Sequence, residues 1–159
     1  MVVVVMGVSG VRKTHIGKLV AESLDIPFFD ADDFHPEANV KKMAGGNPLT
    51  DEDRWPWLDI LAANIDEWNQ AGGAVLACSA LREIYREKLT SVSDDVRFVM
   101  LKADRNQIME RMSERSDHYM PPSLLDSQIN TLEEIDGSNV VMNDGTPEEV
   151  ASRVLKLVS

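Results

Sequence analysis

The amino-acid sequence predicts an α/β fold in which helices cover both faces of a parallel β-sheet. Five short apolar runs, most of them rich in β-branched residues, recur along the 159-residue chain. Longer segments with helical spacing of apolar residues lie between these runs. Strands that are apolar on both faces are typical of parallel sheets buried between helices. Because ligands bind at the carboxyl ends of the strands in such sheets, we expect the functional residues there.

The five expected strands are Val2–Met6, Pro27–Asp30, Ala74–Cys78, Val96–Leu101 and Asn139–Met142. Apolar residues spaced i, i+3, i+4 and i+7 predict one helix around Leu58–Trp68 and another around Val150–Val158. The second of these helices has Thr146 as its expected N-cap. Acidic residues between Pro48 and Asp53 indicate the start of the first one.

Neither an internal repeat nor a linker divides the sequence, so we expect a single domain over residues 1–159. The formal charge of −11 argues against nucleic acid or an anionic membrane as a partner. The apolar start at Met1 is short and lacks a basic segment, so we expect a buried strand and a cytoplasmic protein. The lone Cys78 is expected to be a small buried hydrophobe.

Two polar stretches, Ala31–Asn47 and Arg115–Ser123, fit the alternation of strands and helices poorly. They are either surface loops or a substrate flap and a lid.

A glycine turn follows the first strand and leads into a Lys-Thr pair that opens a helix. Residues Gly7 to Thr14 read Gly-Val-Ser-Gly-Val-Arg-Lys-Thr. Backbone N–H groups of such a loop and the dipole of the following helix bind phosphate groups. Lys13 is expected to reach the β- and γ-phosphates of a nucleotide, and the hydroxyl of Thr14 to ligate Mg²⁺. The alternative is a simple strand-to-helix turn with a solvated lysine.

Arg12 breaks the phosphate-loop pattern, because it stands where the second glycine of Gly-x-x-x-x-Gly-Lys-Ser/Thr belongs. Its guanidinium favours phosphates electrostatically, but its side chain begins where the backbone must approach the nucleotide. If the backbone there has a positive φ, that conformation costs about 1 kcal/mol or more. The sequence therefore leaves turnover open, from mild impairment to complete loss.

Two carboxylates, Asp30 and Asp32, are expected at the end of the second strand. Residues two apart on a strand share a face, so both side chains would point toward the phosphate loop. One would orient Mg²⁺ or its waters, and the other would take the proton from an attacking hydroxyl. The alternative is an acidic turn that closes the strand.

Longer motifs follow one another along the chain: Phe29 to Asn39 with Lys42-Met43, Pro48 to Leu58, Cys78 to Arg82 with Tyr85-Arg86, His118 to Pro122, and Leu125 to Gln128. Together they resemble the gluconokinase family over nearly the whole chain and in the expected order. At the phosphate loop Gly7 to Gly10 and Lys13 match the family, whereas Val11 and Arg12 do not.

The resemblance implies a three-layer P-loop fold with a five-stranded parallel sheet and a small lid, as in shikimate kinase-like and nucleoside monophosphate kinase-like proteins. It implies ATP-dependent phosphorylation of gluconate to 6-phosphogluconate, with Mg²⁺. The acceptor-binding excursion would cover about residues 31–58 and the lid about residues 112–123. Dimers are common among the relatives, so a homodimer is also an expectation.

The resemblance also assigns roles by position. The expected catalytic residues are Lys13, Asp32, Arg111 and Arg115. The expected nucleotide-binding residues are Gly7, Val8, Ser9, Gly10, Val11, Arg12, Lys13, Thr14 and His15. The expected substrate-binding residues are Asp32, His35, Asn39, Arg54, Ser79, Arg82, Tyr85 and His118. The expected Mg²⁺ ligands are Thr14 and Asp30.

The chemistry of gluconate agrees with several of these roles, because its carboxylate needs a cation and its hydroxyls need hydrogen-bonding groups. Arg54 suits the carboxylate as a bidentate partner. Arg82 and Arg86 are four residues apart on an expected helix and either contribute to the site or pair with neighbouring glutamates. His35 alone would equally suit a loop-capping role, and Trp55 and Trp57 are expected to pack.

Arg111 and Arg115 are also spaced i, i+4, and they align with lid arginines that stabilise charge during phosphoryl transfer. The alternative is pairing with Glu110 and Glu114. Ser116-Asp117 replaces a usual Lys-Gly before the lid histidine, which adds an acid and removes a glycine.

Two other functions stay open beside a gluconokinase. The first is a catalytically impaired relative that binds sugar acids or nucleotide, suggested by Arg12 and by Ser116-Asp117. The second is a kinase for another small hydroxylated acid, such as shikimate.

Overall fold

A five-stranded parallel β-sheet forms the centre of the structure. The computed structural model describes residues 1–8, 11–47, 49–103, 129–130, 132–133 and 139–158. The strands are β1 (Val2–Met6), β2 (Phe28–Asp30), β3 (Ala74–Ala77), β4 (Val96–Lys102) and β5 (Val140–Met142). Their order is β2-β3-β1-β4-β5, and every neighbouring pair is parallel. The predicted sheet is confirmed, and each strand boundary lies within one residue of its expected place.

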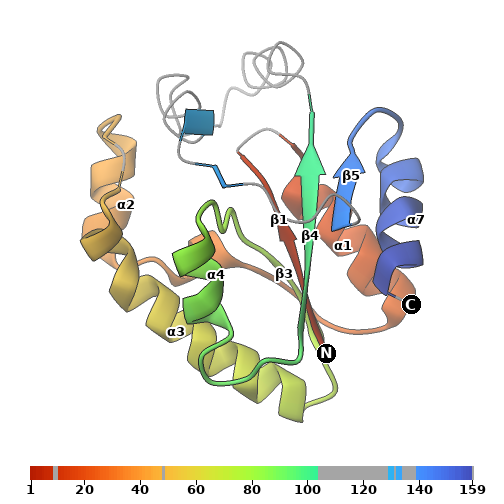
Figure 1. The fold of residues 1–159 in the computed structure, drawn as a ribbon, viewed down its shortest axis with the longest axis horizontal. Coiled ribbons are helices and arrows are strands. Elements are labelled where there is room, and N and C mark those ends of the chain that lie inside the picture. Colours follow the sequence, from red (N-terminus) through yellow and green to blue (C-terminus); the bar gives the residue numbers. More distant parts are fainter. Residues whose placement is uncertain (9–10, 48, 104–128, 131, 134–138, 159) are drawn as a thin grey trace.

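Helices cover both faces of this sheet (Figure 1). They are α1 (Lys13–Leu24), α2 (Glu37–Ala44), α3 (Asp51–Gln70), α4 (Glu83–Leu89) and α7 (Pro147–Val158), with a 3₁₀ helix η1 (Ala31–Phe34). α1 packs against α7 on one side, and α3 packs against α4 on the other. The predicted three-layer architecture is therefore confirmed.

The central strand β1 shows why the sequence folds in this way. All five of its side chains are fully buried, because β3 and β4 flank the strand and helices cover both of its faces. Gly17 allows α1 to approach the sheet closely. A Cβ at this position would lie 2.6 Å from the ring of Phe28 on β2.

Two helix starts that the sequence predicts are present. The side chain of Thr50 accepts a hydrogen bond from the N–H of Asp53, and the Asp53 carboxylate accepts one from the N–H of Thr50. This capping box satisfies backbone donors that the helix itself leaves unpaired. At the other end of the chain, the Thr146 hydroxyl accepts a hydrogen bond from the N–H of Glu149 and caps α7.

Of the two alternatives for Ala31–Asn47, the surface loop is wrong, because η1 and α2 occupy most of this stretch. The second poorly fitting stretch, Arg115–Ser123, lies outside the described residues. Within the part of the chain that the structure describes, no helix is long and apolar enough to cross a membrane.

Candidate active site

The phosphate loop begins where β1 ends, beside the ends of β3 and β4. The N–H of Gly7 donates to the carbonyl of Ser79, which follows β3. Gly7 has φ 138°, and a Cβ here would lie 2.6 Å from the carbonyl oxygen of Leu101 on β4. Only glycine fits such a position, so the first loop glycine is a packing requirement of the sheet edge.

Lys13 folds back onto the loop. Its ammonium donates to the carbonyl oxygens of Gly7 and Val8, at 2.9 and 3.1 Å. Burial lowers the pKa of Lys13 from its ordinary value, and the negative charge of Asp32 opposes this shift. The solvated lysine of the simple-turn alternative is therefore wrong, because Lys13 is held at the carboxyl edge of the sheet.

Arg12 stands immediately before α1 in the left-handed conformation, with φ 65° and ψ 33°. Its carbonyl accepts the first helical hydrogen bond, from the N–H of Ile16. The condition stated from the sequence, a positive φ at this position, is therefore met. Left-handed backbone costs a residue with a Cβ roughly 1 kcal/mol, and glycine almost nothing.

A buried amide from the other end of the chain supports the same loop. Asn143 follows β5 and is 1% exposed, and its Nδ2 donates to the carbonyl of Val11 at 2.8 Å. The N–H of Asn143 donates to the carbonyl of Lys102, the last residue of β4. This contact of Asn143 was not predictable from the sequence, because no spacing relates it to a loop more than 130 residues earlier.

The carboxylate that ends β2 lies against the start of α1. The Thr14 hydroxyl donates to Asp30 Oδ2 at 2.8 Å, and Asp30 Oδ1 accepts from the N–H of Asp32 at 3.0 Å. The expectation that both aspartates share one face of a strand is wrong, because β2 ends at Asp30 and Asp32 lies in η1. Asp30 caps this 3₁₀ turn, and the turn rather than strand alternation orients Asp32.

His35 lies next to the Asp32 carboxylate, and its side chain is 3% exposed. Its ring stacks on Trp57 with the ring centroids 4.1 Å apart, and the Trp57 indole N–H donates to the carbonyl of Ala31 at 2.8 Å. His35 Nε2 lies 3.7 Å from Asp32 Oδ1. The indole thus ties α3 to η1 and holds the imidazole beside the Asp32 carboxylate.

Asn39, from α2, is also buried. Its Nδ2 donates to the carbonyl of Asp53 at 2.9 Å and lies 3.3 Å from Nδ1 of His35. Lys42, one turn further along α2, pairs with the Asp53 carboxylate at 2.7 Å. The hydrogen bond from Lys42, followed by those from Thr50, lowers the pKa of Asp53 to about 2. These contacts fasten α2 to the start of α3.

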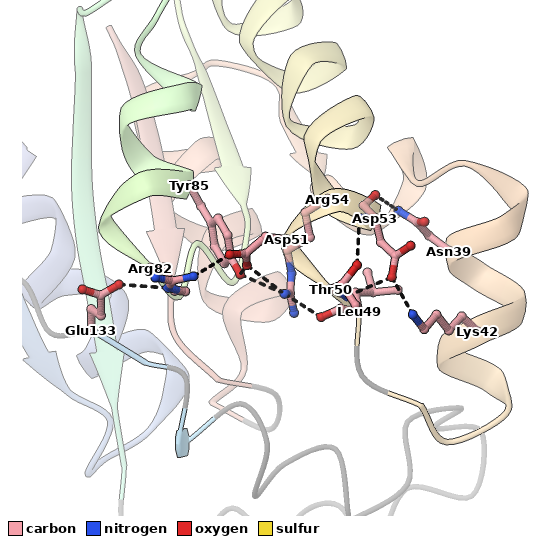
Figure 2. A network of polar contacts seen from close by, with 10 residues as sticks. All are labelled: Asn39, Lys42, Leu49, Thr50, Asp51, Asp53, Arg54, Arg82, Tyr85 and Glu133. Carbon is pink, nitrogen blue, oxygen red and sulfur yellow. Dashed lines mark hydrogen bonds and ion pairs between the residues drawn. The ribbon is translucent and has the colours of Figure 1, made fainter.

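A second group of polar side chains joins α3 to α4 (Figure 2). Arg54 donates through one terminal nitrogen to the carbonyl of Leu49 and to the Tyr85 hydroxyl, both at 2.8 Å. The Tyr85 hydroxyl donates to Asp51, and Arg82 pairs with the other oxygen of Asp51 at 2.6 Å. Three of the expected substrate-binding residues therefore surround one carboxylate.

The same contacts, together with burial, shift the pKa values of several side chains in this group. The hydrogen bond from Tyr85 lowers the pKa of Asp51, and burial raises the pKa of Tyr85. Arg82 also pairs with Glu133 at 3.2 Å, which raises the pKa of the guanidinium. The Asp51 carboxylate therefore lies between the guanidinium groups of Arg54 and Arg82, and Arg82 lies between Asp51 and Glu133.

Arg86 is buried, so the alternative that placed it on a solvated face is wrong. It is 8% exposed and donates to the carbonyls of Ala80, Leu81 and Glu133. Burial lowers the pKa of its guanidinium. Arg86 therefore joins loop backbones together, and it lies neither on a solvated face nor in a pair with Glu87.

Other predictions concern residues nearby. Cys78 is buried, as expected, and burial raises the pKa of its thiol to about 12. His15 is exposed on the first turn of α1. Ser9, Gly10, Arg111, Arg115 and His118, together with the lid at about residues 112–123, lie outside the described residues.

Sequence reasoning did not assign a site role to Asp51 or Glu133. Asp51 was visible only as one of the acids at the start of α3. Glu133 lies 51 residues from Arg82, so only the fold reveals their contact.

A parallel sheet in the order β2-β3-β1-β4-β5, with a phosphate loop after β1, an aspartate at the end of β2 and another in η1, defines the class of P-loop kinases. The family model described as shikimate kinase matches residues 9–159. A gluconokinase from Gluconobacter oxydans is 46% identical over 131 residues, which cover 82% of this chain and 74% of that protein. The chain therefore belongs to the gluconokinase family of shikimate kinase-like P-loop kinases.

Solved structures agree with this assignment. A sugar kinase from Janibacter sp. HTCC2649 is 42% identical, with a TM-score of 0.92 over 99% of this chain and 93% of that one. A gluconokinase from Sinorhizobium meliloti 1021 is 39% identical, with a TM-score of 0.86 over 98% of this chain and 90% of that one.

Proposed function

We propose that this protein transfers the γ-phosphoryl group of ATP to the terminal hydroxyl of gluconate and releases 6-phosphogluconate and ADP. The observation that carries this proposal is the similarity to gluconokinases over most of the chain. The juxtaposition of Lys13, Thr14, Asp30 and Asp32 at one edge of the sheet supports it, because phosphoryl transfer needs a cation, a metal and a base together.

On the nucleotide side, phosphate oxygens would replace the carbonyls of Gly7 and Val8 as partners of the Lys13 ammonium. The Thr14 hydroxyl and the Asp30 carboxylate are hard oxygen donors in mutual contact, which suits Mg²⁺. Bound Mg²⁺ would neutralise charge on the β- and γ-phosphates. We assign the remaining phosphate contacts to Ser9 and Gly10. Arg111 and Arg115 would be the lid arginines that stabilise charge during phosphoryl transfer.

On the acceptor side, the Asp32 carboxylate is 56% exposed and would take the proton of the attacking hydroxyl. The bonds of Arg54 to Leu49 and Tyr85 both use NH1, so its Nε and NH2 remain suited to a bidentate grip on the gluconate carboxylate. Arg82, Tyr85, Ser79 and His118 would contact the rest of the sugar acid.

Three further features belong to this proposal. They are a single domain over residues 1–159, a location in the cytoplasm, and a homodimer.

A coupled assay of ADP release tests the proposed function, with shikimate as the control acceptor. We expect turnover at millimolar ATP and gluconate and none with shikimate. Lys13→Ala should lower kcat at least ~100-fold, because it removes a charge aimed at the transferred group. Folded wild-type protein without turnover would overturn the proposal, and binding titrations would then test the impaired-relative alternative.

A further inference from the structure

A buried histidine connects the acceptor-side helices to the carboxylate proposed as the base. His35 lies between two polar partners, Asn39 Nδ2 at 3.3 Å from its Nδ1 and Asp32 Oδ1 at 3.7 Å from its Nε2. Stacking on Trp57 fixes the plane of the ring between them. With 3% of its side chain exposed, His35 offers little surface to a substrate, whereas Asp32 is 56% exposed.

The hydrogen bonds of Asn39 determine which ring nitrogen carries the proton. A backbone carbonyl only accepts, so the Asn39 atom at 2.9 Å from the Asp53 carbonyl must be the NH₂ group. The same NH₂ group faces His35 Nδ1, which must therefore be the bare, accepting nitrogen. In a neutral imidazole the proton is then on Nε2, which faces Asp32.

The neutral form of this imidazole is favoured at physiological pH. Burial, followed by the positive charge of Arg54, lowers the pKa of His35 to about 4, against the opposing influence of Asp30. The ring therefore carries one nitrogen-bound proton near pH 7. Because Nδ1 accepts from Asn39, that proton is on Nε2.

We infer that His35 is a positioning residue, whose Nε2–H, locked by Asn39, orients the Asp32 carboxylate toward the acceptor hydroxyl. This role differs from the direct substrate contact that the resemblance implies for His35. It rests on the proposed function of Asp32 as the base. At 3.7 Å the Nε2–H is directed at Asp32 Oδ1 without forming a hydrogen bond, and closure to hydrogen-bond distance when the acceptor binds would fix that oxygen for proton removal.

Two-bond ¹H–¹⁵N correlation spectra of the ligand-free protein at pH 7 test the tautomer directly. The chain has three histidines, so the signals are assignable with His35→Gln as the reference. We expect a proton on Nε2 and a bare Nδ1 at His35. A proton on Nδ1 would overturn the inference whatever the activity of the enzyme.

Kinetics separate positioning from packing. His35→Phe keeps a ring against Trp57 but donates nothing, so kcat should fall about 10- to 100-fold with little change in KM for gluconate. His35→Gln retains an N–H donor and should recover part of that loss. A raised KM at unchanged kcat would identify a substrate contact instead, and equal losses in both variants would identify a purely structural role.

The two proposals fail in different ways. If the wild-type protein does not turn over gluconate, the proposed function fails while the tautomer remains measurable. If the wild type is active and His35→Phe is equally active, the inference about His35 fails alone.

Discussion

At the scale of single residues, the backbone of Arg12 is where this chain departs from the phosphate-loop pattern. The structure holds this residue at φ 65°, in the place where the phosphate-loop pattern has glycine. The conformation survives because the neighbouring loop is anchored. The side-chain amide of Asn143 donates a hydrogen bond to the carbonyl of Val11, and the N–H of Ile16 donates to the carbonyl of Arg12.

Arg12→Gly should raise kcat/KM for ATP and gluconate, because glycine adopts this φ without strain and removes the side chain from the phosphate approach. The free energy of unfolding should change by less than about 1 kcal/mol, since relief of strain is offset by the greater freedom of glycine in the unfolded chain. Steady-state kinetics and urea unfolding measure the two effects.

Arg12→Ala is the matched control, because it removes the guanidinium but keeps a Cβ at positive φ. A gain with glycine but not with alanine locates the defect in the backbone. An equal gain in both locates it in the long side chain. Lower activity in both would mean that the guanidinium assists phosphate binding.

At the scale of elements, the start of α3 supports the acceptor side. Its first turn supplies Asp51, Asp53 and Arg54, and the capping box at Thr50 fixes where the helix begins. Lys42 on α2 forms an ion pair with the same Asp53 carboxylate that completes the capping box. The cap therefore connects helix stability to the placement of the acceptor residues.

Thr50→Ala should lower the free energy of unfolding by about 1 kcal/mol, because the N–H of Asp53 loses its side-chain acceptor. Thr50→Ser keeps the hydroxyl and should stay within about 0.5 kcal/mol of the wild type. Urea unfolding of the three proteins checks this. Equal losses for alanine and serine would show that the Thr50 methyl, and not the cap, stabilises α3.

At the scale of the whole molecule, stability should depend on the pH through groups whose pKa changes on folding. The pKa of His35 is about 4 in the folded protein, below the ordinary value of about 6.5 in the unfolded chain. Between these values the unfolded chain binds more protons, so stability is lost as the pH falls through that window. The carboxylate of Asp53, with its pKa near 2, adds a further loss at lower pH.

The free energy of unfolding should therefore rise from pH 4.5 to 6.5, with His35 contributing at most about 1.4 kcal/mol per pH unit. His35→Phe removes this titrating group, so its curve should be flatter than that of the wild type in the same range. Denaturant unfolding at several pH values checks the difference. Parallel curves would contradict a buried, neutral His35.

Much of the fold was predictable because it follows from local patterns. Several signals predict an element from a few neighbouring residues: the four valines of β1, the capping residues Thr50 and Thr146, and the apolar periodicity of α3. The orientation of Asp32 was not predictable in this way. It depends on where β2 stops, which the Asp30 cap on η1 decides.

The parallel sheet, the place of the phosphate loop and the membership of the gluconokinase family could all be predicted from the sequence alone, because apolar periodicity and motifs can be recognised along the chain. The left-handed backbone of Arg12, the support of the loop by Asn143 and the enclosure of His35 between Asn39 and Asp32 arise only in the folded chain. These features depend on contacts between separate elements, and packing and hydrogen bonding select them when the sheet and helices come together.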